Sequence, residues 1–239
     1  MKTDNRSASV ARDVARRTNR GRKAFVMCSP KNQRIEVRLE SRLEQQIAQA
    51  LELDPRVSAY RAQPFTLDLS TGERLLRKPK RKPSGAIYYT PDFALEIPGM
   101  EVAMEVKPSQ YLAAHADLHD EVRRCLLTQG IRFVTVSEQT LPPCYQRNLQ
   151  VLQPYLKQPE AALQSWASAI LTREPEQLCG PVRSALQGLT PLSYFAMAGV
   201  LLGILKTNLQ QHLLEGLDFE VSPAHGSLAA FEVIDFARQ

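Results

Sequence analysis

Three residues that could together carry out acid–base and metal chemistry lie near the middle of the chain. Asp92 follows Pro91, and a single valine separates Glu105 from Lys107. Two carboxylates can hold a divalent cation that polarises a phosphate and lowers the pKa of a bound water, while an ammonium orients that water or stabilises developing charge. The three residues therefore indicate metal-assisted hydrolysis of a phosphodiester. The alternative is a solvated strand face with ordinary surface charges.

The strands expected around these residues bring their side chains together. Residues 87–107 form two extended runs joined by Pro98-Gly99, a natural central pair for a type II turn. In a hairpin with this turn, Asp92 faces Glu105, and opposed like charges destabilise such a pair unless a cation lies between them. Since side chains alternate along a strand, Lys107 leaves the same face as Glu105.

A helix expected over residues 36–53 offers a third acid. Apolar residues recur there at every fourth position and give the helix one apolar face: Leu39, Leu43, Ile47 and Leu51. Glu40 and Glu44 border that face one turn apart, and the periodicity does not choose between them. Two glutamates at this spacing repel mildly, which a nearby cation would relieve, although exposed helix glutamates usually need no explanation.

The order of the expected elements predicts an α/β domain with a mixed sheet. After the hairpin, residues 116–129 form an amphipathic helix that ends at Gly130, residues 131–137 form a buried strand, and residues 145–156 form a further helix. Residues 158–159 are a plausible linker to a second, mostly helical part. Within that part, residues 192–205 are almost entirely apolar and must be buried.

Charge is distributed unevenly along the 239 residues. Residues 1–34 carry a net charge of +8, residues 35–149 are neutral and residues 150–239 carry −3, which together give +5. The first segment has no apolar periodicity, so we expect a basic flexible arm that contacts a polyanion, although a solvated tail or an organelle presequence has the same composition. The arm residues expected to contact DNA are Arg16, Arg17, Arg20, Arg22 and Lys23.

A second basic cluster comes just before the hairpin, where a solvated turn is the alternative to phosphate contact. Its members expected to contact DNA are Arg77, Lys78, Lys80, Arg81 and Lys82.

Several other classes of protein find no support. The longest uncharged apolar run has twelve residues, too few to cross a bilayer. The four cysteines lack the paired spacing of a zinc site, so we expect buried thiols in a reducing cytosol and a cytoplasmic protein. His115 and His119 are one helical turn apart and could share a metal, but without a third ligand an exposed helix face is the simpler interpretation. No Gly-rich phosphate loop, nucleophile elbow or HExxH motif is present.

The residues from Pro91 to Lys107 fit the PD-(D/E)xK nuclease pattern, and the order of segments resembles TnsA, the endonuclease subunit of heteromeric cut-and-paste transposases. The resemblance covers residues 36–157 well and the C-terminal part more loosely. The segments that carry it are Glu40-Ser41-Arg42-Leu43-Glu44, Leu53-Asp54-Pro55, Gln63-Pro64, Thr90-Pro91-Asp92-Phe93, Glu105-Val106-Lys107-Pro108-Ser109 and residues 199–209.

The resemblance implies an α/β fold with a restriction-endonuclease-like mixed-sheet core, followed by a smaller, mostly helical winged-helix-like domain. The implied domains are a basic flexible arm (1–34), a nuclease domain (35–157) and a partner-binding domain (160–239). The catalytic residues would be Glu44, Asp92, Glu105 and Lys107, where some family members carry Gln in place of Glu105. Asp92, Glu105 and the carbonyl of Val106 would bind Mg²⁺, with Mn²⁺ as a substitute.

The implied activity is cleavage of one DNA strand at transposon ends, with double-stranded DNA, the DDE transposase TnsB and the AAA+ regulator TnsC as partners and no membrane. Two rivals stay open. One is a restriction-type or junction-resolving nuclease of the same fold, and the other is a non-catalytic DNA-binding regulator.

Overall fold

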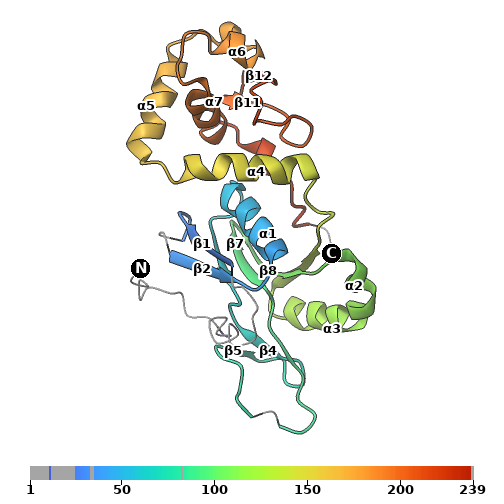
Figure 1. The fold of residues 1–239 in the computed structure, drawn as a ribbon. Helices are drawn as coiled ribbons and strands as arrows, with labels where there is room; N and C mark the ends of the chain where they lie inside the picture. Colours follow the sequence, from blue (N-terminus) through green and yellow to red (C-terminus); the bar gives the residue numbers. More distant parts are fainter. Residues whose placement is uncertain (1–10, 12–24, 33–34, 82, 238–239) are drawn as a thin grey trace. The chain divides into compact units, whose positions relative to one another are not determined.

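The computed structural model describes all residues except 1–10, 12–24, 33–34, 82 and 238–239. The chain is a mixed α/β protein with several sheets (Figure 1). It divides into two compact units. Within the described residues, the first unit comprises residues up to 52, residues 56–140 and residues from 234 onward, and the second comprises residues 53–55 and 141–233.

A four-stranded mixed sheet forms the centre of the first unit, as the sequence predicts. Its order is β3-β7-β8-β9, in which β8 and β9 are parallel and the other neighbours are antiparallel. Parallel neighbouring strands need a crossover connection. Helix α3 forms part of that connection and packs against β9. The elements are β3 (Ala59–Ala62), β7 (Phe93–Ile97), β8 (Met100–Val106), α2 (Ser109–Leu112), α3 (Ala116–Leu127) and β9 (Ile131–Val136).

The β7-β8 hairpin has the expected register. Phe93 pairs with Met104 and Leu95 pairs with Val102, around a turn in which Gly99 has a φ of +77°. A left-handed φ suits the third position of a type II turn and favours glycine there. This register brings the residues just before β7 beside the end of β8, where the candidate acids lie.

A small second sheet lies beside the hairpin, in the order β5-β4-β6. Its strands are β4 (Thr66–Asp68), β5 (Arg74–Leu75) and β6 (Tyr88–Tyr89). The extended run expected over residues 87–97 is therefore divided: its first part pairs with β4 and its second part joins the central sheet. Phe65, Leu67 and Tyr89 from this region join Val122 and Phe133 in one buried apolar cluster.

The helix expected over residues 36–53 begins later than predicted. Residues Ile35–Leu39 form β2, which pairs with β1 (Phe25–Ser29), and α1 spans Arg42–Leu53. Ile35, Val37 and Leu39 alternate with polar residues, which is a strand pattern, and Val37 and Leu39 are buried. The expected arm over residues 1–34 is corrected at its C-terminal end, because residues 25–29 belong to this hairpin.

The second unit combines helices with a three-stranded sheet in the order β10-β12-β11. Helix α7 packs against α4 and α5 and buries Ala196–Leu201, as the apolar composition of this segment predicts. The elements are α4 (Pro143–Leu156), α5 (Glu160–Leu171), β10 (Gly180–Pro181), α6 (Val182–Ala185), α7 (Leu192–Leu201), β11 (Leu205–Lys206) and β12 (Glu220–Pro223). Residues Ala229–Phe231 form a 3₁₀ turn.

Helix α4 belongs to the second unit, whereas the resemblance groups it with the nuclease domain. The fully buried side chain of Asn148 explains this assignment. Its amide donates to the carbonyls of Leu209 and His212 and accepts from the N–H of Leu214, at 2.7 to 2.9 Å. These bonds join α4 to a loop some sixty residues later, so the boundary between the units falls at 140–141.

Two broader expectations concern membranes and thiols. None of the helices in the described part of the chain is both long and apolar enough to span a membrane. No disulfide joins the four cysteines, all of which are described. The expectation of buried thiols is wrong for Cys28 and Cys179, which are exposed, because neither side chain packs into an apolar core.

Candidate active site

Glu105 is a buried carboxylate near the end of β8. The residue is only 5% exposed, and the neighbouring Met104 and Val106, which leave the other face of the strand, are buried as well, so this end of β8 is covered on both faces. Its Oε1 lies 2.8 Å from Nζ of Lys107, and its Oε2 accepts a hydrogen bond of 2.6 Å from the hydroxyl of Tyr89. A buried carboxylate needs such donors, because an unpaired buried charge is costly.

Asp92 lies immediately before β7 and reaches the same strand end. Its Oδ2 accepts a hydrogen bond of 2.8 Å from the backbone N–H of Val106. Burial raises the pKa of Asp92 well above its usual range, and the negative charges of Glu105 and Glu44 raise it further, against the opposing effects of the Val106 N–H and Lys107. The like-charge repulsion expected from the hairpin register is therefore present at this strand end.

Lys107 follows β8 and is partly exposed, with 29% of its side chain accessible. Its backbone N–H donates to the carbonyl of Val136 on β9, which fixes its position at the end of β8. Burial alone would lower its pKa, but the bond to Glu105 and the charges of Glu105, Asp92 and Glu44 outweigh burial and raise it. Lys107 is therefore a firmly protonated ammonium among carboxylates.

Glu44 caps helix α1 and also lies within the field of the strand acids. Its carboxylate accepts hydrogen bonds from the Glu40 N–H at 2.9 Å and the Ser41 hydroxyl at 2.8 Å, while its own N–H donates to the Ser41 oxygen. The Ser41 oxygen caps the helix, and Glu44 reaches back one residue beyond the N-cap of a standard capping box, for which Ser41-x-x-Glu44 is the sequence signal. Burial is the main cause of its raised pKa, and the charges of Glu40 and Glu105 add to it.

The structure distinguishes Glu44 from Glu40 where periodicity does not. Glu44 is 7% exposed, and its charge acts on Asp92. Glu40 is less buried and accepts a hydrogen bond of 3.0 Å from the side-chain amide of Gln63. Glu44 is therefore the helix acid electrostatically coupled to Asp92 and Glu105.

Gln63 is a site residue that the sequence marks only by its place in a resembling segment. Its backbone N–H donates to the carbonyl of Asp92 at 2.8 Å, so it connects β3 to the residue that carries the strand acid. It is buried, has a left-handed φ of +47°, and its Oε1 has no hydrogen-bond partner among the described residues. Backbone strain and an unsatisfied buried polar atom are features that concentrate at functional sites.

Tyr89 and His119 also lie near Glu105. The sequence analysis did not identify Tyr89, and it expected His119 on an exposed helix face. The Tyr89 ring packs edge-on against Phe133 and His119, at centroid distances of 6.0 and 6.4 Å. His119 is only 4% exposed, which corrects the expectation of an exposed helix face, and burial lowers its pKa. Because His119 stacks on His115 and sits among aromatic rings, its role in the described structure is packing.

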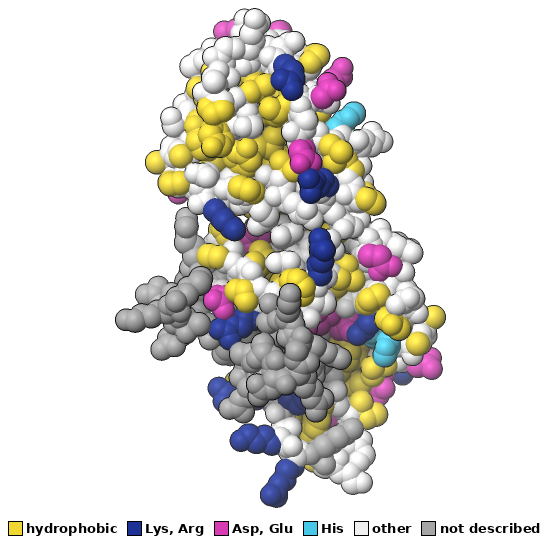
Figure 2. Space-filling model, viewed as in Figure 1, with side chains coloured by type: hydrophobic (Ala, Val, Ile, Leu, Met, Phe, Trp, Pro, Cys, Tyr) yellow, Lys and Arg dark blue, Asp and Glu magenta, His cyan; other side chains and the backbone are white. Residues whose placement is uncertain are grey.

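The basic segment after β5 is a surface loop. All four of its described candidate DNA contacts are exposed: Arg77, Lys78, Lys80 and Arg81. Figure 2 shows Lys and Arg side chains projecting from the lower end of the first unit, where Figure 1 draws this loop. Lys82 and the arm residues Arg16, Arg17, Arg20, Arg22 and Lys23 lie outside the described residues.

One described residue of the expected arm makes backbone contacts near the site. The Ala11 N–H donates to the Gln63 carbonyl at 2.9 Å, and the Ala11 carbonyl accepts from the Lys78 N–H at 3.2 Å. Ala11 is also buried. Of the arm residues ahead of β1, the one that the structure describes is therefore anchored between the candidate site and the basic loop.

The donor set suits a hard cation bound by few protein ligands. No group of three His, Cys, Asp or Glu side chains in the described part of the chain is arranged to hold a metal ion. Asp92 and Glu105 supply two carboxylates, and Mg²⁺ typically uses one or two carboxylates and retains several waters. The mutual repulsion of the acids is the observation that favours a cation, because it is the term that a cation would reverse.

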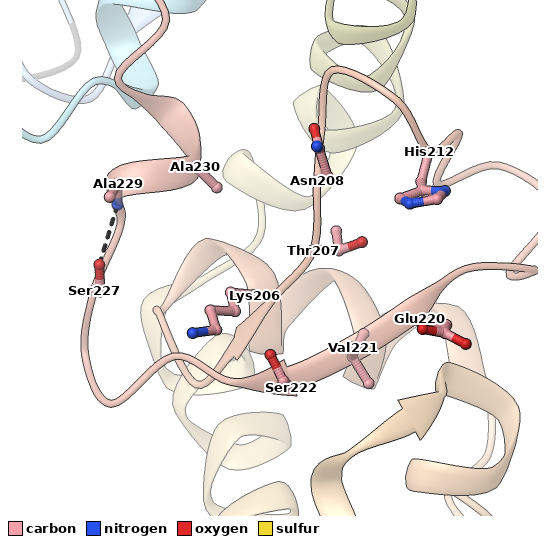
Figure 3. Close-up of a pocket in the computed structure, with 10 residues that line it drawn as sticks. All are labelled: Lys206, Thr207, Asn208, His212, Glu220, Val221, Ser222, Ser227, Ala229 and Ala230. Atoms are coloured by element: carbon pink, nitrogen blue, oxygen red, sulfur yellow. Dashed lines mark hydrogen bonds between the residues drawn. The ribbon is translucent and has the colours of Figure 1, made fainter.

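The second unit, which holds none of these acids, has a hollow of its own. It is a groove of about 460 Å³, lined by strand and loop residues from β11 to residue 230. Figure 3 shows Lys206, Thr207 and His212 on one side and Glu220 and Ser222 on the β12 side. The buried Oγ1 of Thr207 has no hydrogen-bond partner among the described residues. The groove is shallow, is lined by both polar and apolar atoms, and has Glu220 as the one carboxylate among its described lining residues.

Comparison with known proteins adds no relatives: no family model matches the chain, and no curated protein matches it.

Proposed function

We propose that this protein is a metal-dependent DNA endonuclease whose active site comprises Asp92, Glu105 and Lys107, with Glu44 in support. The observation that carries the proposal is the shared strand end. The carboxylate of Asp92 is bonded to Val106, that of Glu105 is bonded to Lys107, and the acids raise the pKa of Asp92. A solvated strand face would leave these acids exposed, whereas Glu105 is buried.

Asp92, Glu105 and the carbonyl of Val106 are the groups that would hold Mg²⁺, with Mn²⁺ as a substitute. When bound, such an ion polarises a phosphate and lowers the pKa of a water ligand. Lys107 orients the attacking water or stabilises the charge that develops on the phosphate. Glu44 would complete the outer shell of that ion or hold a second one, and its charge acts on Asp92.

The exposed basic loop supplies the DNA contacts of this proposal. Phosphate contacts from Lys and Arg position a duplex without reading its sequence. The backbone bond between Lys78 and Ala11, together with that between Ala11 and Gln63, links the loop to the site residues within the first unit. The basic arm would add further phosphate contacts. The basic residues of the arm and the loop are therefore the proposed DNA contacts.

The resemblance to TnsA supplies the finer parts of the proposal. On this resemblance, the first unit has a restriction-endonuclease-like core and the second unit is winged-helix-like. The protein is cytoplasmic and cuts one strand at transposon ends beside the DDE transposase TnsB. The second unit would bind the AAA+ regulator TnsC. The acids of this unit that could meet a basic partner are Glu215, Asp218 and Glu220; Glu215 is paired with Arg147 at 2.7 Å, whereas Glu220 lines the groove of Figure 3. We therefore assign the groove as the partner surface.

The experiment that tests this function compares three DNA substrates. The full chain, alone and with a TnsB-type DDE transposase, is incubated with Mg²⁺ and plasmids carrying transposon ends, scrambled ends or a four-way junction. Cleavage at the transposon ends of the strand that the transposase alone leaves uncut supports the proposal. Cleavage independent of the ends or confined to the junction would support the rival nuclease, and DNA binding with no Mg²⁺-dependent cleavage would support the regulator.

A further inference from the structure

The hydroxyl of Tyr89 holds one oxygen of Glu105, and Lys107 holds the other. The distances are 2.6 Å from the phenol oxygen to Oε2 and 2.8 Å from Nζ to Oε1. Both Tyr89 and Glu105 are buried, at 8% and 5% exposure. A carboxylate oxygen offers two lone pairs, so one hydrogen bond to each leaves one lone pair on each oxygen for a cation.

Tyr89 is itself fixed by rigid elements. It lies in β6, where it pairs with Leu67 of β4, and its ring is part of the apolar cluster with Phe65 and Phe133. The hydroxyl therefore reaches Glu105 from a packed core position on another sheet. A group placed this way loses little conformational entropy when it makes its hydrogen bond.

Lys107 and Tyr89, the two donors to Glu105, differ in their other functions. Lys107 is partly exposed and, in the nuclease proposed above, must also serve the water or the phosphate. Tyr89 is buried and has no such second task, so it can keep Glu105 oriented when the ammonium turns toward the substrate. Groups that orient a metal-binding side chain commonly change metal affinity when they are removed.

We propose that Tyr89 is a positioning residue: its hydroxyl fixes Glu105 in the orientation that binds the divalent cation. This inference rests on the proposed function, since it assigns Glu105 to a metal. It predicts a loss of metal affinity in Tyr89→Phe, which removes the hydroxyl and keeps the ring. The expected loss is roughly 10–100-fold.

The test is a calorimetric titration of the full chain with Mn²⁺ and with Mg²⁺. Tyr88→Phe is the matched control, because Tyr88 is the adjacent strand residue, is less buried and makes no hydrogen bond through its hydroxyl that the described structure records. Thermal unfolding in a chelator establishes that each variant is folded, and low-temperature titration accommodates a less stable variant.

A second readout separates positioning from general damage. The rate of DNA cleavage is measured against Mg²⁺ concentration. For Tyr89→Phe, the midpoint should move to higher Mg²⁺ while the rate at saturating Mg²⁺ returns close to the original value. In a Glu105→Gln background, adding Tyr89→Phe should cost no further metal affinity.

The outcomes distinguish the two proposals. If the original chain and Tyr88→Phe bind the metal equally and Tyr89→Phe binds it more weakly, the inference is supported. If Tyr89→Phe also binds it equally, the role of Tyr89 is overturned and the nuclease proposal stands. If the original chain binds neither Mn²⁺ nor Mg²⁺ in this titration or in the presence of DNA, both proposals fail.

Discussion

The ammonium of Lys107 lies 2.8 Å from Oε1 of Glu105, within the same strand end that Asp92 reaches through the Val106 N–H. The proposed catalytic ammonium and a proposed metal ligand are thus paired with each other. A cation bound through the remaining lone pairs of Glu105 would weaken this pairing and leave the ammonium available for water or phosphate.

Replacing either residue should remove cleavage and preserve the fold. Asp92→Ala and Lys107→Ala should each lower strand cleavage by at least about 100-fold, because each removes a group that acts on the reacting phosphate. In the transposase setting, the partner still cuts its own strand, so products should shift from simple excision to cointegrates. Unchanged excision with either variant would argue against a catalytic role.

Repulsion between Asp92 and the nearby acids should lower the free energy of unfolding. Asp92 has a raised pKa in the folded chain, so the folded state binds this proton more tightly than the unfolded state. Its contribution to the free energy of unfolding is therefore full below the unfolded pKa of about 4 and is lost as pH rises through the folded pKa. Asp92→Asn keeps an acceptor for the Val106 N–H and removes the charge.

We expect the stability of Asp92→Asn relative to the original chain to increase with pH, reaching on the order of 1 kcal/mol in a metal-free buffer. Saturating Mg²⁺ should reduce or reverse this advantage, because the cation stabilises the ionised acids. Urea unfolding from pH 4 to pH 8, with and without Mg²⁺, measures both effects. A difference that is constant with pH would contradict the raised pKa.

Phosphate binding by the basic loop should appear in the salt dependence of DNA affinity. Replacing Arg77, Lys78, Lys80 and Arg81 together by Gln should make the slope of log affinity against log salt shallower by about 0.9 for each phosphate that is no longer neutralised. Sequence preference should not change. Arg183→Gln is the control, since Arg183 donates to a backbone carbonyl in the second unit. The same slope in both variants would identify the loop as a solvated turn.

Deleting residues 1–22 tests the arm by the same measurement. If arm residues bind phosphates, the slope should again become shallower, and affinity should fall without a change in sequence preference. An unchanged slope would identify the arm as a solvated tail or a protein-binding segment.

The boundary at 140–141 makes a prediction about fragments. A fragment of residues 141–233 should unfold cooperatively, whereas residues 160–239 should not, because they lack Asn148 and the backbone bonds it makes to Leu209, His212 and Leu214. Asn148→Ala in the full chain should cost about 3 kcal/mol, since it leaves buried backbone groups without partners. Gln150→Ala, at an exposed position on the same helix, should cost little.

If 160–239 is as stable as 141–233, the division at 140–141 is wrong. The folded fragment should bind the AAA+ regulator in a salt-sensitive way and should not bind duplex DNA measurably at physiological salt.

The hairpin and its register could be predicted because two independent signals agree. Pro98-Gly99 supplies the turn chemistry, and the alternation through Met104 and Val106 determines which face each side chain leaves. The start of α1 could not be read from Leu39, because that residue fits both a four-residue period and the alternation of β2. Ser41-x-x-Glu44 carries a capping-box signal that locates the helix start correctly.

The site residues that sequence reasoning missed depend on tertiary contacts. Tyr89 meets Glu105 only because β6 leaves the extended run and pairs with β4, and Pro91, between the two parts, is a local break signal that does not reveal the new partner strand. Gln63 meets Glu40 and Asp92 across separate elements. The burial of His119 similarly depends on packing against Tyr89 and Phe133, which helical spacing does not reveal.

Metal-dependent cleavage by this site is tested by a strand-cleavage assay. Purified full chain and its Asp92→Asn variant are incubated, together with the partner transposase, with end-labelled DNA carrying the element's ends in Mg²⁺, in Mn²⁺ or in chelator. With the original chain in either metal, we expect cutting of the strand that the transposase alone leaves uncut. With Asp92→Asn, only the transposase's own strand should be cut, and in chelator the strand assigned to this chain should stay intact. Equal cutting of the assigned strand by Asp92→Asn, or cutting of it that persists in chelator, would contradict a metal-dependent site at Asp92.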